Sequence, residues 1–251
     1  MAGNTKPRQS LFNQKLARIK HYLKHDRRHD SEFLPPPFVI EFGGSPDSGK
    51  TTTIEKLYQT LHRDGFSVST PQEGAMATQH ISRKDPMYNY YTGVYALKNL
   101  LDAVHMHTFD VIILDRGIFD TPTWMQYWLD KGAISAEECD IASQFFLSRI
   151  WMKHITASYY FVADADVAVL RDLEYASTDA LGESTNPESI AKRVKHYKML
   201  FEKLGPHYPQ LELIDTTNLT RQAMIDMITG KVLGAIERQI AERKLARRKQ
   251  A

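Results

Sequence analysis

Short apolar runs alternate with amphipathic segments along most of this chain. The apolar runs are four or five residues long and predict strands at 38–42, 111–114, 159–162 and 211–214, with a weaker strand at 67–70. Between the runs, the spacing of apolar residues predicts helices. Their expected ranges are 50–63, 88–106, 166–173, 186–204 and from 219 onward, with another helix opened by the capping box of Ser135 and Glu138.

Strands that alternate with helices are typical of a parallel sheet covered on both faces. We therefore expect an α/β fold with three layers, α/β/α, around a five-stranded parallel sheet. The polar segment 174–186 is expected to be a loop, because its residues are small and polar.

The N-terminal region follows a different pattern. Phe12, Leu16, Ile19 and Leu23 recur at helical spacing and predict a helix over 10–29 with one apolar stripe, which three prolines at 35–37 then end. The sequence thus divides into a basic helical N-terminal extension (1–37), one α/β domain (38–235) and a basic C-terminal helix or tail (236–251). The apolar stripe and the long 88–106 helix are candidate surfaces for a homodimer.

Composition narrows the class of protein. The chain has 251 residues, of which 42% are hydrophobic and 25% charged, as in ordinary globular domains. Its one cysteine, Cys139, excludes a disulfide framework and a cysteine-rich metal site. No apolar run is long enough for a transmembrane helix, and the first residues lack the apolar core of a signal peptide, so we expect a cytoplasmic protein with no membrane partner.

Charge is distributed unevenly. The net charge is +2, but residues 1–36 and 231–251 each carry +5, whereas residues 37–230 carry −8. Such basic ends are usually solvated, and they are also candidate contacts for nucleic acid or another acidic partner.

The segment between the first strand and the first helix of the domain matches the phosphate-loop pattern G-x-x-x-x-G-K-[ST]. Gly44 and Gly49 allow the backbone to turn its N–H groups toward a polyphosphate, and Lys50 supplies a positive charge for the β- and γ-phosphates. The hydroxyl of Thr51 is suited to Mg²⁺. The expected nucleotide-binding residues are Gly44, Ser45, Pro46, Asp47, Ser48, Gly49, Lys50, Thr51 and Thr52.

A second candidate feature is Asp115-Arg116 at the end of the 111–114 strand. Catalytic groups in open α/β sheets gather beyond the carboxyl ends of strands, where the phosphate loop also lies. Asp115 could accept a proton from an attacking hydroxyl or hold water on Mg²⁺, and Arg116 could grip a phosphate or the acceptor. Asp120 stands just before Thr121-Pro122 and is interpreted as a helix-start residue.

Together these motifs resemble the thymidylate kinase group of the nucleoside and nucleotide kinase superfamily, over residues 38–235. The segments 163–171 and 193–197 are similar to that group's strand, helix, lid and following helix, and 213–218 resembles its last strand and adenine-side loop. The chain departs from the group in three places. Gly117 stands where an aromatic residue is usual, Pro71-Gln72-Glu73-Gly74 replaces Arg-Glu-Pro, and the 174–186 loop contains no arginine.

The resemblance implies an ATP- and Mg²⁺-dependent phosphotransferase that moves the γ-phosphoryl group to a nucleoside or a nucleoside monophosphate. Because phosphoryl transfer needs positive charge around the γ-phosphate, arginines outside the loop become candidates. The candidate catalytic residues are Lys50, Asp115, Arg116 and Arg171. The candidate acceptor-binding residues are Glu73, Arg116, Tyr91 and Arg193, and the candidate metal ligands are Thr51 and Asp115.

Two other functions fit the same sequence. A polynucleotide 5′-kinase would use the basic ends to bind RNA or DNA. A nucleotide-dependent switch would bind nucleotide at the phosphate loop and present the N-terminal helix to a partner. The sequence leaves open whether a kinase acceptor would react through a hydroxyl or through a phosphate.

Overall fold

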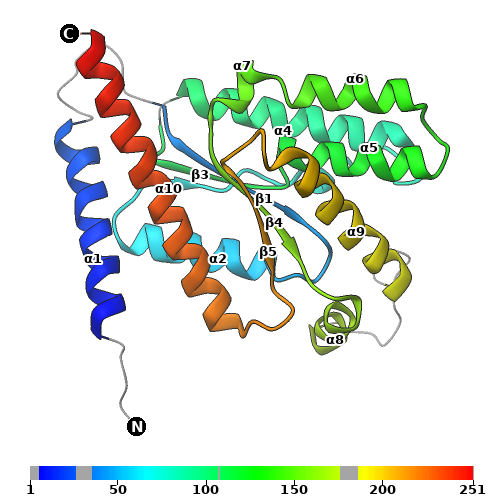
Figure 1. The fold of residues 1–251 in the computed structure, drawn as a ribbon, viewed down its shortest axis with the longest axis horizontal. Coiled ribbons are helices and arrows are strands. Elements are labelled where there is room, and N and C mark those ends of the chain that lie inside the picture. The colour runs from blue at the N-terminus through cyan, green and yellow to red at the C-terminus, as the bar shows by residue number, and fades with distance from the viewer. Residues whose placement is uncertain (1–5, 27–35, 107, 176–185, 251) are drawn as a thin grey trace.

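A five-stranded sheet forms the centre of the molecule, with helices on both faces (Figure 1). The computed structural model describes residues 6–26, 36–106, 108–175 and 186–250. All strand pairs are parallel, in the order β2-β3-β1-β4-β5, as expected for the three-layer fold. The strands are β1 (Phe38–Gly44), β2 (Val68–Ser69), β3 (Val111–Asp115), β4 (Ile155–Val162) and β5 (Leu211–Asp215).

The helices in the described part of the chain follow the predicted order, with short additions. The longer ones are α1 (Lys6–His21), α2 (Lys50–Arg63), α4 (Pro86–Met106), α5 (Thr121–Asp130), α6 (Ala136–Phe146), α8 (Ala165–Tyr175), α9 (Pro187–Leu204) and α10 (Arg221–Gln250). The short ones are α3 (Gly74–Ala77), α7 (Arg149–Met152), a 3-10 turn η2 (Ile118–Asp120) and a π-helical turn η1 (Tyr22–Asp26) that continues α1.

The alternation of side chains along the strands produces two apolar cores. Phe38, Ile40 and Phe42 of β1 face a core shared with α1, α2 and α10, whereas Val39 faces the core on the α4 and α9 side. A smaller apolar cluster lies around Met125 between α5 and α6. The sheet is therefore buried on both faces, which explains why its strands read as continuous apolar runs.

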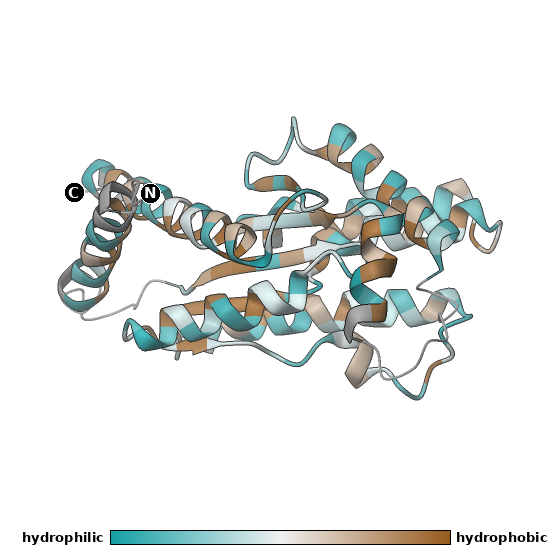
Figure 2. Ribbon diagram, turned by 90° about the horizontal axis from the view of Figure 1, so that it is seen from below, coloured by the Kyte–Doolittle hydropathy of each residue, from teal (hydrophilic) through white to brown (hydrophobic). Residues whose placement is uncertain are grey.

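The first and last helices pack side by side. Leu16, Ile19 and Tyr22 of the N-terminal segment share a core with Val232 and Ile236 of α10, and α1 and α10 lie side by side at one edge of the molecule (Figures 1 and 2). The predicted apolar stripe is thus covered within the chain. The boundary predicted after residue 235 falls inside α10, which continues without a break to Gln250.

The N-cap of α5 is Asp120 and not Thr121, so the helix begins one residue earlier than expected. The capping box of Ser135 and Glu138 is present as predicted. Of the predicted loop 174–186, residues 176–185 lie outside the described residues. Among the helices that the structure describes, none is both long enough and apolar enough to cross a membrane.

Candidate active site

The phosphate loop follows β1 directly and adopts the conformation that its glycines allow. Gly44 has φ +137°, and a Cβ at this position would lie 2.1 Å from the carbonyl oxygen of Phe161 in β4. Gly49 has φ +89° and forms the N-cap of α2. Both conformations disfavour any residue with a side chain, as the motif predicts. Because β1 lies between β3 and β4, the loop opens at the centre of the sheet edge.

Lys50, the predicted source of positive charge for the phosphates, lies inside this loop and is shielded from solvent. The residue is only 7% exposed, and its Nζ donates to the carbonyl oxygens of Ser45 (2.7 Å) and Gly44 (3.3 Å). Burial, together with the nearby charge of Arg116, lowers the pKa of Lys50 to about 8. A bound polyphosphate would compete with the two carbonyls for the ammonium protons and would favour its charged form.

The remaining loop residues surround the same turn. Ser48 is buried and donates to the Ser45 carbonyl at 2.7 Å, and Asp47 has the uncommon φ of +50°. Thr51 is exposed in the first turn of α2, and Thr52 is half-buried. Pro46 also lines the large cavity described below.

Arg171 ties the outer side of the loop to the end of β5. Its guanidinium donates to Thr216 at 2.8 Å (carbonyl) and 3.1 Å (hydroxyl), and more weakly to the Asp47 carbonyl at 3.5 Å. Thr216 in turn donates to the Ser48 carbonyl at 2.9 Å. The structure therefore places Arg171 behind the phosphate loop, and it is not among the residues that line the cavity.

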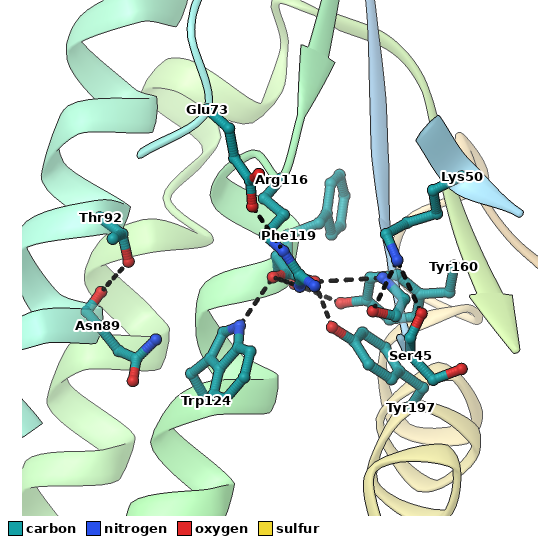
Figure 3. Close-up of polar contacts among 12 residues, drawn as sticks. Ser45, Lys50, Glu73, Asn89, Thr92, Arg116, Phe119, Trp124, Tyr160 and Tyr197 are labelled. Carbon is teal, nitrogen blue, oxygen red and sulfur yellow. Dashed lines mark hydrogen bonds and ion pairs between the residues drawn. The ribbon is translucent and has the colours of Figure 1, made fainter. Parts of the chain in front are cut away.

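On the opposite side of the loop, Arg116 is held between two carboxylates (Figure 3). Its Nε lies 2.9 Å from Glu73 and its Nη1 lies 2.9 Å from Asp120. Arg116 also has φ +59°, a conformation that a non-glycine residue rarely adopts and that is common at functional sites. Burial raises the pKa of Glu73, and the charge of Arg116 opposes that rise.

Asp115 ends β3 opposite Phe42, next to the start of the phosphate loop. Its charge acts on both Lys50 and Glu73, so it belongs to the same electrostatic group. It is half-buried and, unlike Glu73, does not line the cavity.

Asp120 connects the parts of this site and was missed by sequence reasoning. It is 2% exposed, and its carboxylate accepts hydrogen bonds from Arg116 (2.9 Å), Trp124 (2.8 Å), Tyr197 (2.5 Å) and, at 3.4 Å, the N–H of Gly44. The spacing of Asp120 and Trp124 by four residues was the available signal, because it places these two side chains on one side of the predicted helix.

Glu41 lies beneath these residues in β1 and explains the glycine at position 117. Its Oε1 accepts the N–H of Phe119 at 2.7 Å, and a Cβ on Gly117 would lie 2.1 Å from the Glu41 carboxyl carbon. Burial and the charge of Asp120 raise the pKa of Glu41 to about 8. A larger residue at 117, as in thymidylate kinases, would displace this carboxyl.

A cavity of about 1190 Å³ opens beside Arg116 and Glu73. Its walls come from α3, the start of α4, one face of α5, and the start of α9. Trp124 stands in this wall, with Arg116 and Arg193 over its ring at 5.6 and 5.2 Å. Of the predicted acceptor-binding residues, Glu73, Arg116 and Arg193 line the cavity, whereas Tyr91 is 40% exposed, packs edge-on against His80, and lies outside it.

The residues at the loop fit a magnesium ion held jointly with phosphates. Mg²⁺ usually takes one or two protein ligands and completes its octahedron with water and phosphate oxygens. Thr51, in the first turn of α2, and Asp115, at the end of β3, offer such a hydroxyl and carboxylate. Within the described ranges, no group of three or more acidic, histidine or cysteine side chains could hold a metal alone.

Solved structures with a similar fold come from deoxyadenosine kinase of M. mycoides. One was determined with the products dCMP and a flexible dCDP, one with dCTP and one with dATP, and their TM-scores are 0.59, 0.55 and 0.56. In each case the match covers 78% of this chain and 98% of the other, at 16% identity. The chain shares the fold of deoxyadenosine kinase. Neither a protein family nor a curated protein matches the sequence itself.

Proposed function

We propose that this protein is an ATP- and Mg²⁺-dependent kinase that phosphorylates a hydroxyl group of a nucleoside-type acceptor. The observation that carries the proposal is the Glu73–Arg116 pair, which lines a large cavity beside a phosphate loop. The shared fold with a deoxyadenosine kinase supports the same reaction class, and the thymidylate kinase resemblance gives ATP as the donor.

The charges near Arg116 favour a hydroxyl over a phosphate as the reacting group. Arg116 is already paired with two carboxylates, Glu73 and Asp120, and the charge of Asp115 also acts on this group. The acidic groups therefore occupy the cation that an acceptor phosphate would need at this end of the cavity. A hydroxyl needs a base to accept its proton, whereas an acceptor phosphate would be repelled by the same carboxylates.

Each residue then has a chemical role. Glu73 accepts the hydroxyl proton, because it lines the cavity and its pKa is raised, which makes it a better base. Arg116 orients Glu73, and Lys50 neutralises the phosphates of the donor. Thr51 and Asp115 hold Mg²⁺, which when bound neutralises charge on the phosphate oxygens.

The experiment is transfer of labelled γ-phosphate from ATP to deoxy- and ribonucleosides, their monophosphates and a 5′-hydroxyl oligonucleotide. We expect transfer to hydroxyl acceptors only, and none by Lys50→Ala. Glu73→Gln should lower kcat by roughly 10²-fold at all Mg²⁺ concentrations, whereas Asp115→Asn should mainly raise the Mg²⁺ concentration needed for half-maximal rate. ATP binding without transfer to any acceptor would contradict the proposal and favour a nucleotide-dependent switch.

A further inference from the structure

The cavity is strongly polarised along its length. Six cationic side chains line it, against three carboxylates. The cationic residues are Arg83, Lys84, Arg116, Lys131, Lys192 and Arg193, and the acidic residues are Glu73, Asp120 and Glu188. Two of the three carboxylates, Glu73 and Asp120, bind Arg116 and so lie at the inner end, beside the phosphate loop, whereas Glu188 lies in the first turn of α9.

The outer end carries four of the other five cations, whereas Arg193 lies over the Trp124 ring, nearer to Arg116. Arg83 and Lys84 precede α4, Lys131 follows α5, and Lys192 lies in the second turn of α9. All four residues are exposed, and within the described part of the chain none of them forms an ion pair with a carboxylate. Four cations from three separate segments thus face one cavity, an arrangement that attracts an anion.

The two ends are far apart. One face of α5 lines the cavity from Asp120 through Trp124 and Trp128 to Lys131. The eleven residue steps from Asp120 to Lys131 correspond to about 16 Å at a helical rise of about 1.5 Å per residue. The cavity volume of about 1190 Å³ also exceeds the range of roughly 300–1,000 Å³ that is common for sites holding one small ligand.

We propose that the acceptor carries a phosphate group in addition to its reacting hydroxyl, and that this phosphate lies at the outer end of the cavity, between Lys131 and Lys192. The inference rests on the proposed hydroxyl kinase and names the class of its substrate. The acidic inner end receives the hydroxyl and the cationic outer end receives the phosphate, so the charges of the cavity orient the acceptor. The phosphate could belong to a nucleoside 3′-phosphate or to the chain of a 5′-hydroxyl oligonucleotide.

The test compares kcat/KM for a nucleoside, its 3′-phosphate and a short 5′-hydroxyl oligonucleotide. We expect phosphate-bearing acceptors to exceed the plain nucleoside by about tenfold, and the advantage to shrink as salt is added. The phosphate-bearing acceptor with the higher kcat/KM identifies whether the bound phosphate belongs to a nucleotide or to an oligonucleotide chain. Equal kcat/KM for all three acceptors would overturn the proposal and leave the kinase itself intact.

Two lysines on one helix supply a matched pair of variants. Lys192 lines the cavity, whereas Lys195 is exposed on α9 away from it. Lys192→Gln should lower kcat/KM about fivefold for phosphate-bearing acceptors and leave the plain nucleoside unchanged. Lys195→Gln should change neither. An equal effect of both substitutions would refute a specific phosphate site.

A binding measurement separates this inference from the reaction. If no acceptor is phosphorylated, the same oligonucleotide is titrated against Lys50→Ala protein, with and without Lys131→Gln. A dissociation constant raised about fivefold by Lys131→Gln would support the phosphate site even though the proposed function had failed. An unchanged constant, or no binding, would overturn it.

Discussion

Replacing Asp120 with asparagine should destabilise the protein more than removing the Tyr197 hydroxyl that donates to it. The carboxylate accepts hydrogen bonds through both oxygens, with Arg116 and Trp124 on one oxygen and Tyr197 and the Gly44 N–H on the other. An amide has only one accepting oxygen, so in either orientation its NH₂ group faces two donors. These donors are buried or half-buried and lose their acceptor.

The magnitude follows from those two lost bonds and from the lost charge opposite Arg116. A buried donor left without an acceptor costs about 1–3 kcal/mol, and breaking a buried ion pair costs about 3–5 kcal/mol. Because the Arg116 side chain is 24% exposed, we expect the lower end, about 3 kcal/mol of unfolding free energy. Tyr197→Phe removes one donor and leaves the carboxylate satisfied by the others, so it should cost about 1 kcal/mol.

Urea unfolding, followed by circular dichroism, measures both variants. Asp130→Asn is a suitable control, since that carboxylate binds His196 at 2.8 Å but is 34% exposed and should contribute less than about 1 kcal/mol. A loss for Asp120→Asn no larger than that for Tyr197→Phe would refute the view that Asp120 holds the site together. A changed slope of the unfolding free energy against urea concentration would indicate that the substitution had also altered the unfolded state.

Three further predictions concern charge and space around the phosphate loop. The pKa of Glu41 is raised from 4.5 to about 8, so between these pH values the folded chain binds more protons than the unfolded chain. The free energy of unfolding should therefore fall as pH rises, by up to about 1.4 kcal/mol per pH unit. Glu41→Gln should flatten that slope in urea titrations at pH 5 to 8, and an unchanged slope would contradict it. Because the pKa of Lys50 is lowered to about 8, ATP binding near this pH should take up a proton, and the affinity for ATP should fall as pH rises further. Calorimetry in buffers of different ionisation enthalpy should detect the proton uptake. A binding heat that does not depend on the buffer would exclude it. Gly117→Ala places a Cβ against Glu41 and should lower the free energy of thermal unfolding by about 2 kcal/mol. Gly230→Ala is the control, because a Cβ there meets nothing within 4 Å and should be neutral or stabilising. Equal melting temperatures for the two variants would argue against the clash.

Most of the fold was predictable because the signals were local. The apolar runs at 111–114 and 159–162, the phosphate-loop glycines and the capping box at Ser135 each determine the conformation of their own segment, and the structure contains all of them. The short helices α3 and α7 were not predicted. Their four residues are too few to show a periodicity.

The site was harder to predict because its key contacts join distant segments. Asp120 precedes a helix and carries a typical N-cap side chain, but its carboxylate turns toward Arg116 and Tyr197 and makes no cap hydrogen bond. The sequence also gave no sign that Arg171 would bind Thr216, which is 45 residues away. Pairings of this kind depend on the order of the strands, which the spacing of residues along the chain does not reveal.

The packing of α1 on α10 has a consequence for how the chain is made. A polypeptide leaves the ribosome from its N-terminus, so α1 emerges before the strands of the sheet and α10 emerges after them. Until α10 appears, Leu16, Ile19 and Tyr22 have no apolar helix to cover them. During synthesis the nascent chain therefore exposes a hydrophobic, basic helix for as long as the whole sheet takes to be translated. That interval is when a chaperone would be most useful to this protein.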